Sequence, residues 1–213
     1  MDSKFNFLAT GRTNEELLER IDNRQKYMPE TVDASVAELQ FRGHVFSDDE
    51  LRVIDEDIQA HRNNAAQVDG RLGFFNNNTN NVIVNDPDAP TMYSRRALYT
   101  FTVLCGALFG SILMAMNISK TEKKGNAFWV VLFGIGFTVL QYYIMSNLAK
   151  QGSGSSSAII GGIVAAYILD FIFWKRFIGY ATFYRARQIW VPLVIAVVIG
   201  ALLVLAIIYG GQQ

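Results

Sequence analysis

The sequence has little of the residue types that bind metals or form disulfides. It holds one cysteine, Cys105, and two histidines, His44 and His61. A single cysteine excludes an intramolecular disulfide and leaves the redox compartment undefined. The histidines are 17 residues apart on or near predicted helices, a spacing that does not make them cooperating ligands of one metal ion. We therefore expect no metal or cofactor site.

The motifs of common enzyme classes are missing as well. Gly134 with Gly136, and Gly161 with Gly162, lie inside apolar runs and lack the basic or hydroxyl residue that follows in a phosphate-binding loop. The GSGSSS stretch after Gln151 superficially resembles a nucleophile elbow, but its composition is typical of a flexible polar turn. The sequence predicts a protein that is not an enzyme.

Charge is distributed unevenly along the chain. Up to Ser94 there are nine Lys/Arg against 17 Asp/Glu, a net charge of −8. From Arg95 onward ten Lys/Arg face only Glu122 and Asp170, a net charge of +8. Long apolar runs occur only in this second part. The contrast predicts three regions: a soluble amphipathic helical segment (1–62), an Asn-, Gly- and Pro-rich linker (63–94) and a transmembrane domain (95–213).

Helix start and stop signals are strong in the first region. Capping boxes of the S/T-x-x-E type begin at Thr13 and Ser47. Pro29 suits a helix first turn, and Gly43 suits the left-handed residue after a helix end. We expect three helices over approximately residues 14–61. Their apolar stripes are narrow, so the segment should rest on a partner protein, on the membrane or on a second copy.

The predicted linker is not purely polar. It contains Phe74, Phe75 and the short apolar run at residues 82–84. Two interpretations stay open: a loop that packs on a neighbouring surface, or a short strand that adds to the sheet edge of a partner.

Four apolar runs dominate the second half, and they predict a helical membrane bundle. About 20 helical residues cross a 30 Å hydrocarbon layer. The third run is marginal in length and contains Asp170, so it could be tilted, short or re-entrant. The expected fold is all-α, with a small soluble helical segment before an integral bundle of about four transmembrane helices, at 97–118, 126–148, 158–174 and 190–209.

Asp170 is the most suggestive single residue, because an ionisable side chain inside a span usually has a partner or a task. We expect it to pair with a basic neighbour, and a proton or ion relay is the alternative. Gln141 and Tyr142 are the candidates to face it in a polar intramembrane site. Small residues four apart, such as Gly106 and Gly110, predict close helix packing.

The stretch from residue 174 to 190 interleaves basic and aromatic residues, which is typical of a chain lying along a membrane interface. Anionic lipid headgroups are the expected partners, and nucleic acid is not. The candidate lipid contacts are Lys175, Arg176, Arg185 and Arg187.

One segment resembles a known group of sequences. Residues 27–43 follow the pattern Y-x-P-E-x-V-x-A-x-x-x-E-L-x-x-R-G, and Ile189, Trp190, Pro192 and Leu193 follow I-W-x-P-L. Both patterns resemble uncharacterised multi-pass membrane proteins from Bacteroidota-type bacteria. The resemblance implies a bacterial inner-membrane protein and carries no activity. Its motif suggests a candidate partner-docking site at Tyr27, Pro29, Glu30, Arg42 and Gly43.

The side of the membrane is not settled by charge. If all four runs cross, seven basic residues lie opposite the amino terminus and three lie beside it, which favours an exported amino terminus. The absence of a signal sequence in the acidic segment favours a cytoplasmic one, and we prefer this second arrangement.

Two functions follow from this interpretation. The preferred one is a non-enzymatic membrane adaptor whose helical segment docks another protein. The alternative is a subunit of a small channel or transporter, motivated by Asp170. Close packing of small residues also makes a homo-oligomer reasonable.

Overall fold

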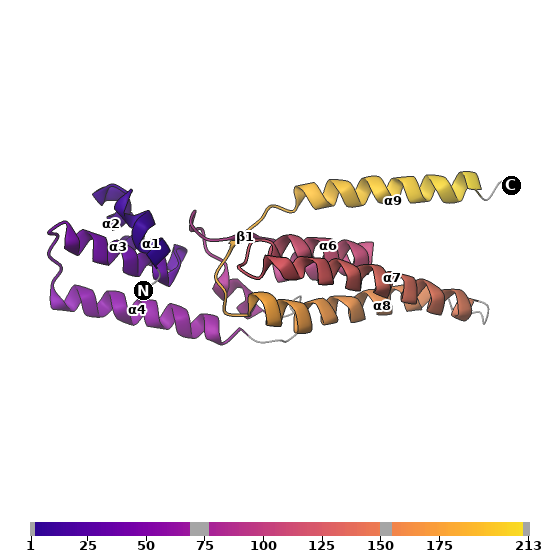
Figure 1. The fold of residues 1–213 in the computed structure, drawn as a ribbon, viewed down its shortest axis with the longest axis horizontal. Coiled ribbons are helices and arrows are strands. Elements are labelled where there is room, and N and C mark those ends of the chain that lie inside the picture. Colours follow the sequence, from indigo (N-terminus) through magenta and orange to yellow (C-terminus); the bar gives the residue numbers. More distant parts are fainter. Residues whose placement is uncertain (1–2, 69–76, 150–154, 211–213) are drawn as a thin grey trace.

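The computed structural model describes residues 3–68, 77–149 and 155–210, and shows an elongated, mostly helical molecule. The helices between residues 3 and 66 gather at one end, and those between residues 107 and 168 lie side by side towards the other (Figure 1). The last helix runs in the same direction beside them. The helices are α1 (Ser3–Thr10), α2 (Asn14–Asp22), α3 (Pro29–Phe41), α4 (Asp48–Ala66), α5 (Arg95–Cys105), α6 (Ala107–Ile118), α7 (Ala127–Ala149), α8 (Ser155–Ile168) and α9 (Trp190–Gly210), with the short 3-10 helices η1 (Arg24–Lys26), η2 (Asn77–Val82) and η3 (Lys124–Asn126) and the π-helix η4 (Leu169–Ile178).

The helix signals of the first region are confirmed. The side chains of Thr13 and Ser47 each accept a hydrogen bond from the backbone N–H of the third helical residue, a glutamate. The carboxylate of that glutamate accepts a hydrogen bond from the backbone N–H of the cap residue. Pro29 opens α3, and Gly43 follows it with a φ of 90°. The structure adds α1, which the sequence analysis did not predict.

These four helices share a small apolar core. It is centred on residues that are almost fully buried, including Leu17, Val32, Leu39 and Ile58. α1 contributes Ala9 to this core. We call α1 to α4 the helical head.

The predicted linker is ordered where the structure describes it. Ile83 bridges to Tyr184, and the two-residue strand β1 (Thr91–Met92) pairs in parallel with β2 (Arg185–Ala186). The extended edge therefore pairs within its own chain, and Phe74 and Phe75 lie outside the described residues. We call residues 77–94 of the linker, together with residues 179–189 that pair with them, the junction.

The predicted bundle of about four transmembrane helices is wrong. Among the described residues, one helical segment, Lys124–Asn147, is long and apolar enough to cross a membrane. The third run is the short α8 followed by the π-helix η4, and Ala107–Ile118 and Trp190–Leu202 are shorter apolar stretches.

The first run does not form one helix, because the chain turns back at Gly106. This residue has a φ of 89° and a ψ of 169°, a conformation essentially limited to glycine. Residues on either side of the turn then meet. A Cβ on Gly110 would lie 1.9 Å from the Thr102 hydroxyl oxygen, and the Asn117 amide exchanges two 2.8 Å hydrogen bonds with the backbone of Tyr93. α5 and α6 thus form a helical hairpin that starts and ends at the junction.

Small residues allow the hairpin to pack tightly against its neighbours. Gly134 of α7 lies against Ser111, and a Cβ on Gly162 of α8 would be 3.0 Å from the backbone of Val103. The close packing expected from these residues is therefore found within one chain. Gly106 is the exception, because it forms the turn between α5 and α6 and does not lie at a close contact between helices.

Candidate functional sites

The second half of the chain contains a buried ion pair between Asp170 and Arg95. Both side chains are almost fully buried, at 6% and 1% exposure for the residues. Arg95 donates from Nε and Nη2 to the two carboxylate oxygens, at 2.8 and 2.5 Å. Tyr99 donates to the same carboxylate at 3.0 Å, and the ring of Tyr180 lies 4.4 Å from the guanidinium.

This pair is a structural clamp between α5 and η4. Bidentate arginine and a phenol together give the carboxylate three hydrogen bonds, so its charge is well compensated. The adjoining cavity measures about 10 Å³, which leaves room for about one water. Asp170 thus has the expected basic partner, although the partner comes from the start of α5.

The structure does not bring Gln141 and Tyr142 to Asp170. Gln141 lies against Gly161 of α8, nine residues before Asp170, or about 13 Å along a helix. The side chain of Tyr142 is largely exposed. The predicted three-residue polar site is therefore not assembled.

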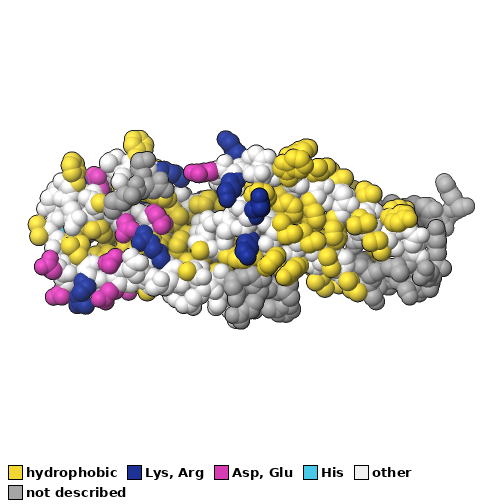
Figure 2. Space-filling view, turned by 60° about the horizontal axis from the view of Figure 1, so that its bottom comes forward, with side chains coloured by type: hydrophobic (Ala, Val, Ile, Leu, Met, Phe, Trp, Pro, Cys, Tyr) yellow, Lys and Arg dark blue, Asp and Glu magenta, His cyan; other side chains and the backbone are white. Residues whose placement is uncertain are grey.

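The predicted lipid-contact residues lie in and around the junction. Lys123 donates to the carbonyl of Arg176, and Lys175 lies 5.0 Å from the ring of Phe171. Arg185 donates to Thr91, and the Arg187 guanidinium stacks 5.0 Å from the ring of Tyr93. In Figure 2 a group of Lys and Arg side chains lies midway along the molecule. The basic band comprises Arg95, Arg96, Lys120, Lys123, Lys124, Lys175, Arg176, Arg185 and Arg187, although Arg95 is buried.

Beyond the basic band, large apolar side chains are exposed. Figure 2 shows them beyond the group of Lys and Arg side chains, on the side away from the helical head. They come from α7, α8 and α9, and we call them the apolar end. Members more than half exposed are Phe128, Trp129, Val139, Leu140, Ile159, Ile160, Trp190, Val191, Val194, Val197, Val198 and Leu202.

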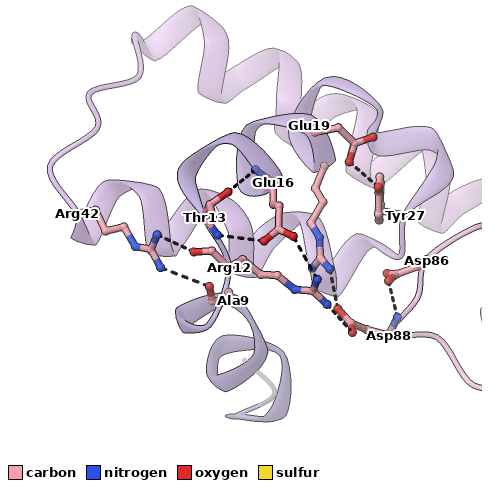
Figure 3. Close-up of polar contacts among 10 residues, drawn as sticks. Ala9, Arg12, Thr13, Glu16, Glu19, Tyr27, Arg42, Asp86 and Asp88 are labelled. Carbon is pink, nitrogen blue, oxygen red and sulfur yellow. Dashed lines mark hydrogen bonds and ion pairs between the residues drawn. The ribbon is translucent and has the colours of Figure 1, made fainter.

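The candidate docking motif serves contacts inside the helical head. Arg42 pairs with Glu38 at 2.7 Å and donates to the carbonyl of Thr10 at 3.1 Å. It also donates to the carbonyls of Arg12 and Ala9, at 2.8 and 3.5 Å (Figure 3). It thereby caps the end of α1, where a positive charge is favourable. Gly43 terminates α3 and Pro29 begins it.

The other two motif residues also have internal partners. Tyr27 donates to Glu19, and burial together with this bond raises the pKa of Tyr27 to about 12. Glu30 lies 3.8 Å from Arg62, which also bonds Asp33 at 2.7 Å. These internal contacts give the motif residues a role in the folding of the helical head.

Two aspartates tie the junction to the helical head. Asp86 is fully buried and accepts from the Met28 backbone at 3.1 Å and the Thr31 hydroxyl at 2.6 Å, so it caps the start of α3. Asp88 binds Arg20 at 2.8 Å and Arg12 at 3.3 Å (Figure 3). The sequence analysis missed both residues, and their N-D-P-D spacing is the available signal.

A groove of about 400 Å³ lies between α2 and α4 on the helical head. Its apolar lining comes from both helices and from Phe46, whose ring lies edge-to-face with that of His44, with centroids 4.5 Å apart. Acidic side chains outnumber basic ones along it. A backbone hydrogen bond from Ser47 lowers the pKa of Glu50, so this carboxylate is ionised at neutral pH. The acidic groove is lined by Leu18, Ile21, Asp22, Arg24, His44, Phe46, Asp49, Glu50, Val53 and Ile54.

Comparison of the chain with protein-family models, with curated proteins and with solved structures finds no match. The resemblance to Bacteroidota-type membrane proteins stays a prediction.

Proposed function

We propose that this protein is a non-enzymatic adaptor attached to a membrane, which holds a basic amphipathic segment of another protein in the acidic groove. The observation that carries the proposal is the order of surfaces along the long axis. An acidic helical head, a basic band and an exposed apolar end follow one another (Figure 2). This order matches water, lipid headgroups and hydrocarbon.

Membrane attachment accounts for the apolar end. Proteins that stay in water rarely expose apolar patches larger than a few hundred Å². Here α7 exposes Trp129 and Val139, and α9 exposes Trp190 and Val197. We propose that α7 crosses the bilayer and that the hairpin of α5 and α6 enters it from the junction side, as re-entrant segments do when protein covers them.

The basic band favours a cytoplasmic position for the helical head. Because the hairpin returns to the junction, Lys120, Lys123 and Lys124 lie on the same side as Arg185 and Arg187. The positive-inside rule then agrees with a head in the bacterial cytoplasm, at the inner membrane.

The acidic groove defines the chemistry of the partner. An apolar floor accepts the apolar face of a helix, and Asp22, Asp49 and Glu50 attract basic residues beside it. The alternative function, a subunit of a small channel or transporter, has less support because Asp170 is fully engaged in a structural pair. Homo-oligomerisation remains a proposal for the same exposed faces.

A site-specific photo-crosslinker tests the docking proposal in native membranes. Placed at Val53, which lines the groove, it should capture a protein whose crosslinked peptide is basic and amphipathic. Ala60, exposed on the same helix outside the groove, is the matched control and should capture much less. Asp49→Lys with Glu50→Lys should remove the capture. Equal capture from both positions, or capture of only its own copies, would count against an adaptor.

A further inference from the structure

A second groove, distinct from the acidic one, runs between the hairpin and α9. It consists of two adjoining hollows of about 480 and 340 Å³, which share Leu104, Cys105 and Ala196. The lining is almost entirely apolar from Phe101 to Ile112. α9 therefore stands away from the hairpin along a continuous apolar channel, which we call the α9 groove.

One end of the α9 groove is cationic. Arg96 and Ser94 line it there, at the level of the junction. Arg96 donates from Nη2 to Asn77 at 2.8 Å, whereas its Nε is buried and has no hydrogen-bond partner among the described residues. Arg96 therefore brings an incompletely hydrogen-bonded, positively charged guanidinium to this end of the groove, and an anionic occupant would complement it.

The length of the α9 groove corresponds to one leaflet. On α9 its lining extends from Ile189 to Gly200, eleven residues or about 16 Å of helix. Half of a 30 Å hydrocarbon layer is about 15 Å. The cationic end lies at the basic band, where headgroups would be, and the apolar length extends from it.

We propose that the α9 groove binds an anionic glycerophospholipid, with an acyl chain between the hairpin and α9 and its phosphate on Arg96. A guanidinium suits this task because its planar fork matches phosphate oxygens. Arg187, stacked on Tyr93 next to Ser94, adds a second positive charge nearby. A helix of a second copy would fill the apolar length but would bring no anion to Arg96. This inference rests on the proposed membrane attachment.

The test uses the full chain in phosphatidylcholine vesicles that contain a minor share of phosphatidylglycerol. The protein is released in mild detergent, and native mass spectrometry counts the retained phosphatidylglycerol. The original chain should retain it, and Arg96→Gln should lower retention about tenfold, as expected for loss of one charge-assisted hydrogen-bond donor. Lys120→Gln removes an exposed charge of the same band outside the groove and should change retention little.

A second variant tests the apolar length separately. Ala196→Phe places a ring where both hollows meet and should also reduce retention, while co-flotation with the vesicles persists. Equal losses in Arg96→Gln and Lys120→Gln would overturn the groove in favour of diffuse attraction. Unchanged retention in Ala196→Phe, or self-crosslinking through Cys105 in place of bound lipid, would overturn it too. Co-flotation of the original chain is measured first. Failure to co-float would refute membrane attachment itself, whereas loss of retained lipid in a chain that co-floats would concern only the groove.

Discussion

The ion pair of Asp170 and Arg95 determines what a single substitution does in the second half of the chain. Removing one partner of a buried pair leaves the other charge uncompensated, which typically destabilises a protein by about 3–5 kcal/mol. Asp170→Asn should therefore lower the free energy of unfolding by this amount, measured by denaturant titration in detergent. Lys175→Gln, an exposed neighbour, is the control and should change it by less than about 0.5 kcal/mol.

Replacing both Arg95 and Asp170 tests whether Asp170 has a structural role or acts as a proton or ion relay. Arg95→Met combined with Asp170→Leu should recover most of the lost stability, because a well-packed apolar pair avoids the desolvation of two charges. An unchanged midpoint for Asp170→Asn alone would show that the carboxylate contributes nothing to the fold.

His61 makes the attachment of the helical head sensitive to pH. Its ring packs on Phe183 of the junction with centroids 4.8 Å apart, and burial lowers its pKa below the ordinary 6.5, although Glu30 opposes this shift. The unfolded chain then binds a proton at a higher pH than the folded one. Stability should be constant above about pH 7 and should fall as the pH drops through 6.5 towards the lower folded value.

The measurement for His61 is thermal unfolding over a pH series. His61→Gln should remove the increment that belongs to this residue, while acid unfolding through carboxylates at lower pH persists. A series for His61→Gln that superimposes on the original chain between pH 7 and 5 would contradict the assignment.

Single residues were predictable only in part. Asp170 stands out because it is ionisable within an apolar run, and the sequence indicates that it needs a basic partner. Its actual partner, Arg95, lies 75 residues earlier. In the sequence, Arg95 cannot be distinguished from any other basic residue that flanks an apolar run. Sequence spacing cannot identify a contact that depends on how two helices pack.

At the level of elements, the hairpin of α5 and α6 depends on Gly106. Its backbone conformation is unfavourable for any residue with a Cβ, by about 1–3 kcal/mol. No heavy atom lies within 4 Å of the added Cβ, so the effect of Gly106→Ala is conformational. We expect this variant to lower the unfolding midpoint, measured by circular dichroism in detergent.

Gly136 provides the matched control for the hairpin. It also has open space around its Cβ position, but it lies in the regular helix α7. Gly136→Ala should be neutral or stabilise by up to about 1 kcal/mol, since alanine favours a helix over glycine. Equal effects of the two substitutions would mean that Gly106 is not under backbone constraint.

The helical head was predictable and the hairpin was not, for a physical reason. Capping boxes at Thr13 and Ser47 are local bonds, so four consecutive residues specify each helix start. The turn at Gly106 is also local, but its sequence is apolar on both sides and has the composition of an unbroken span. The junction was missed because its pairing partners, Ile83 with Tyr184 and β1 with β2, are far apart in sequence.

For the whole molecule, the hairpin determines which side of the membrane each loop would occupy under the proposed attachment. If the first apolar run crossed, Lys120, Lys123 and Lys124 would lie opposite the helical head. In the structure Lys123 bonds the backbone of Arg176, and both lie with the junction. Under the proposed membrane attachment these lysines join the basic band on the side of the helical head, and the positive-inside rule then favours one arrangement.

This arrangement makes a prediction about labelling from each side of the membrane. In a Cys105→Ser background, Thr121→Cys, Arg185→Cys and Gln59→Cys should react with a membrane-impermeant maleimide from the same side, because hairpin, junction and head are continuous. Inverted membrane vesicles should show this labelling and intact cells should not, if the head is cytoplasmic. Labelling of Thr121→Cys from the side opposite to Gln59→Cys would mean that α5 and α6 separate and cross the bilayer, and the hairpin would then not be the membrane form of the protein.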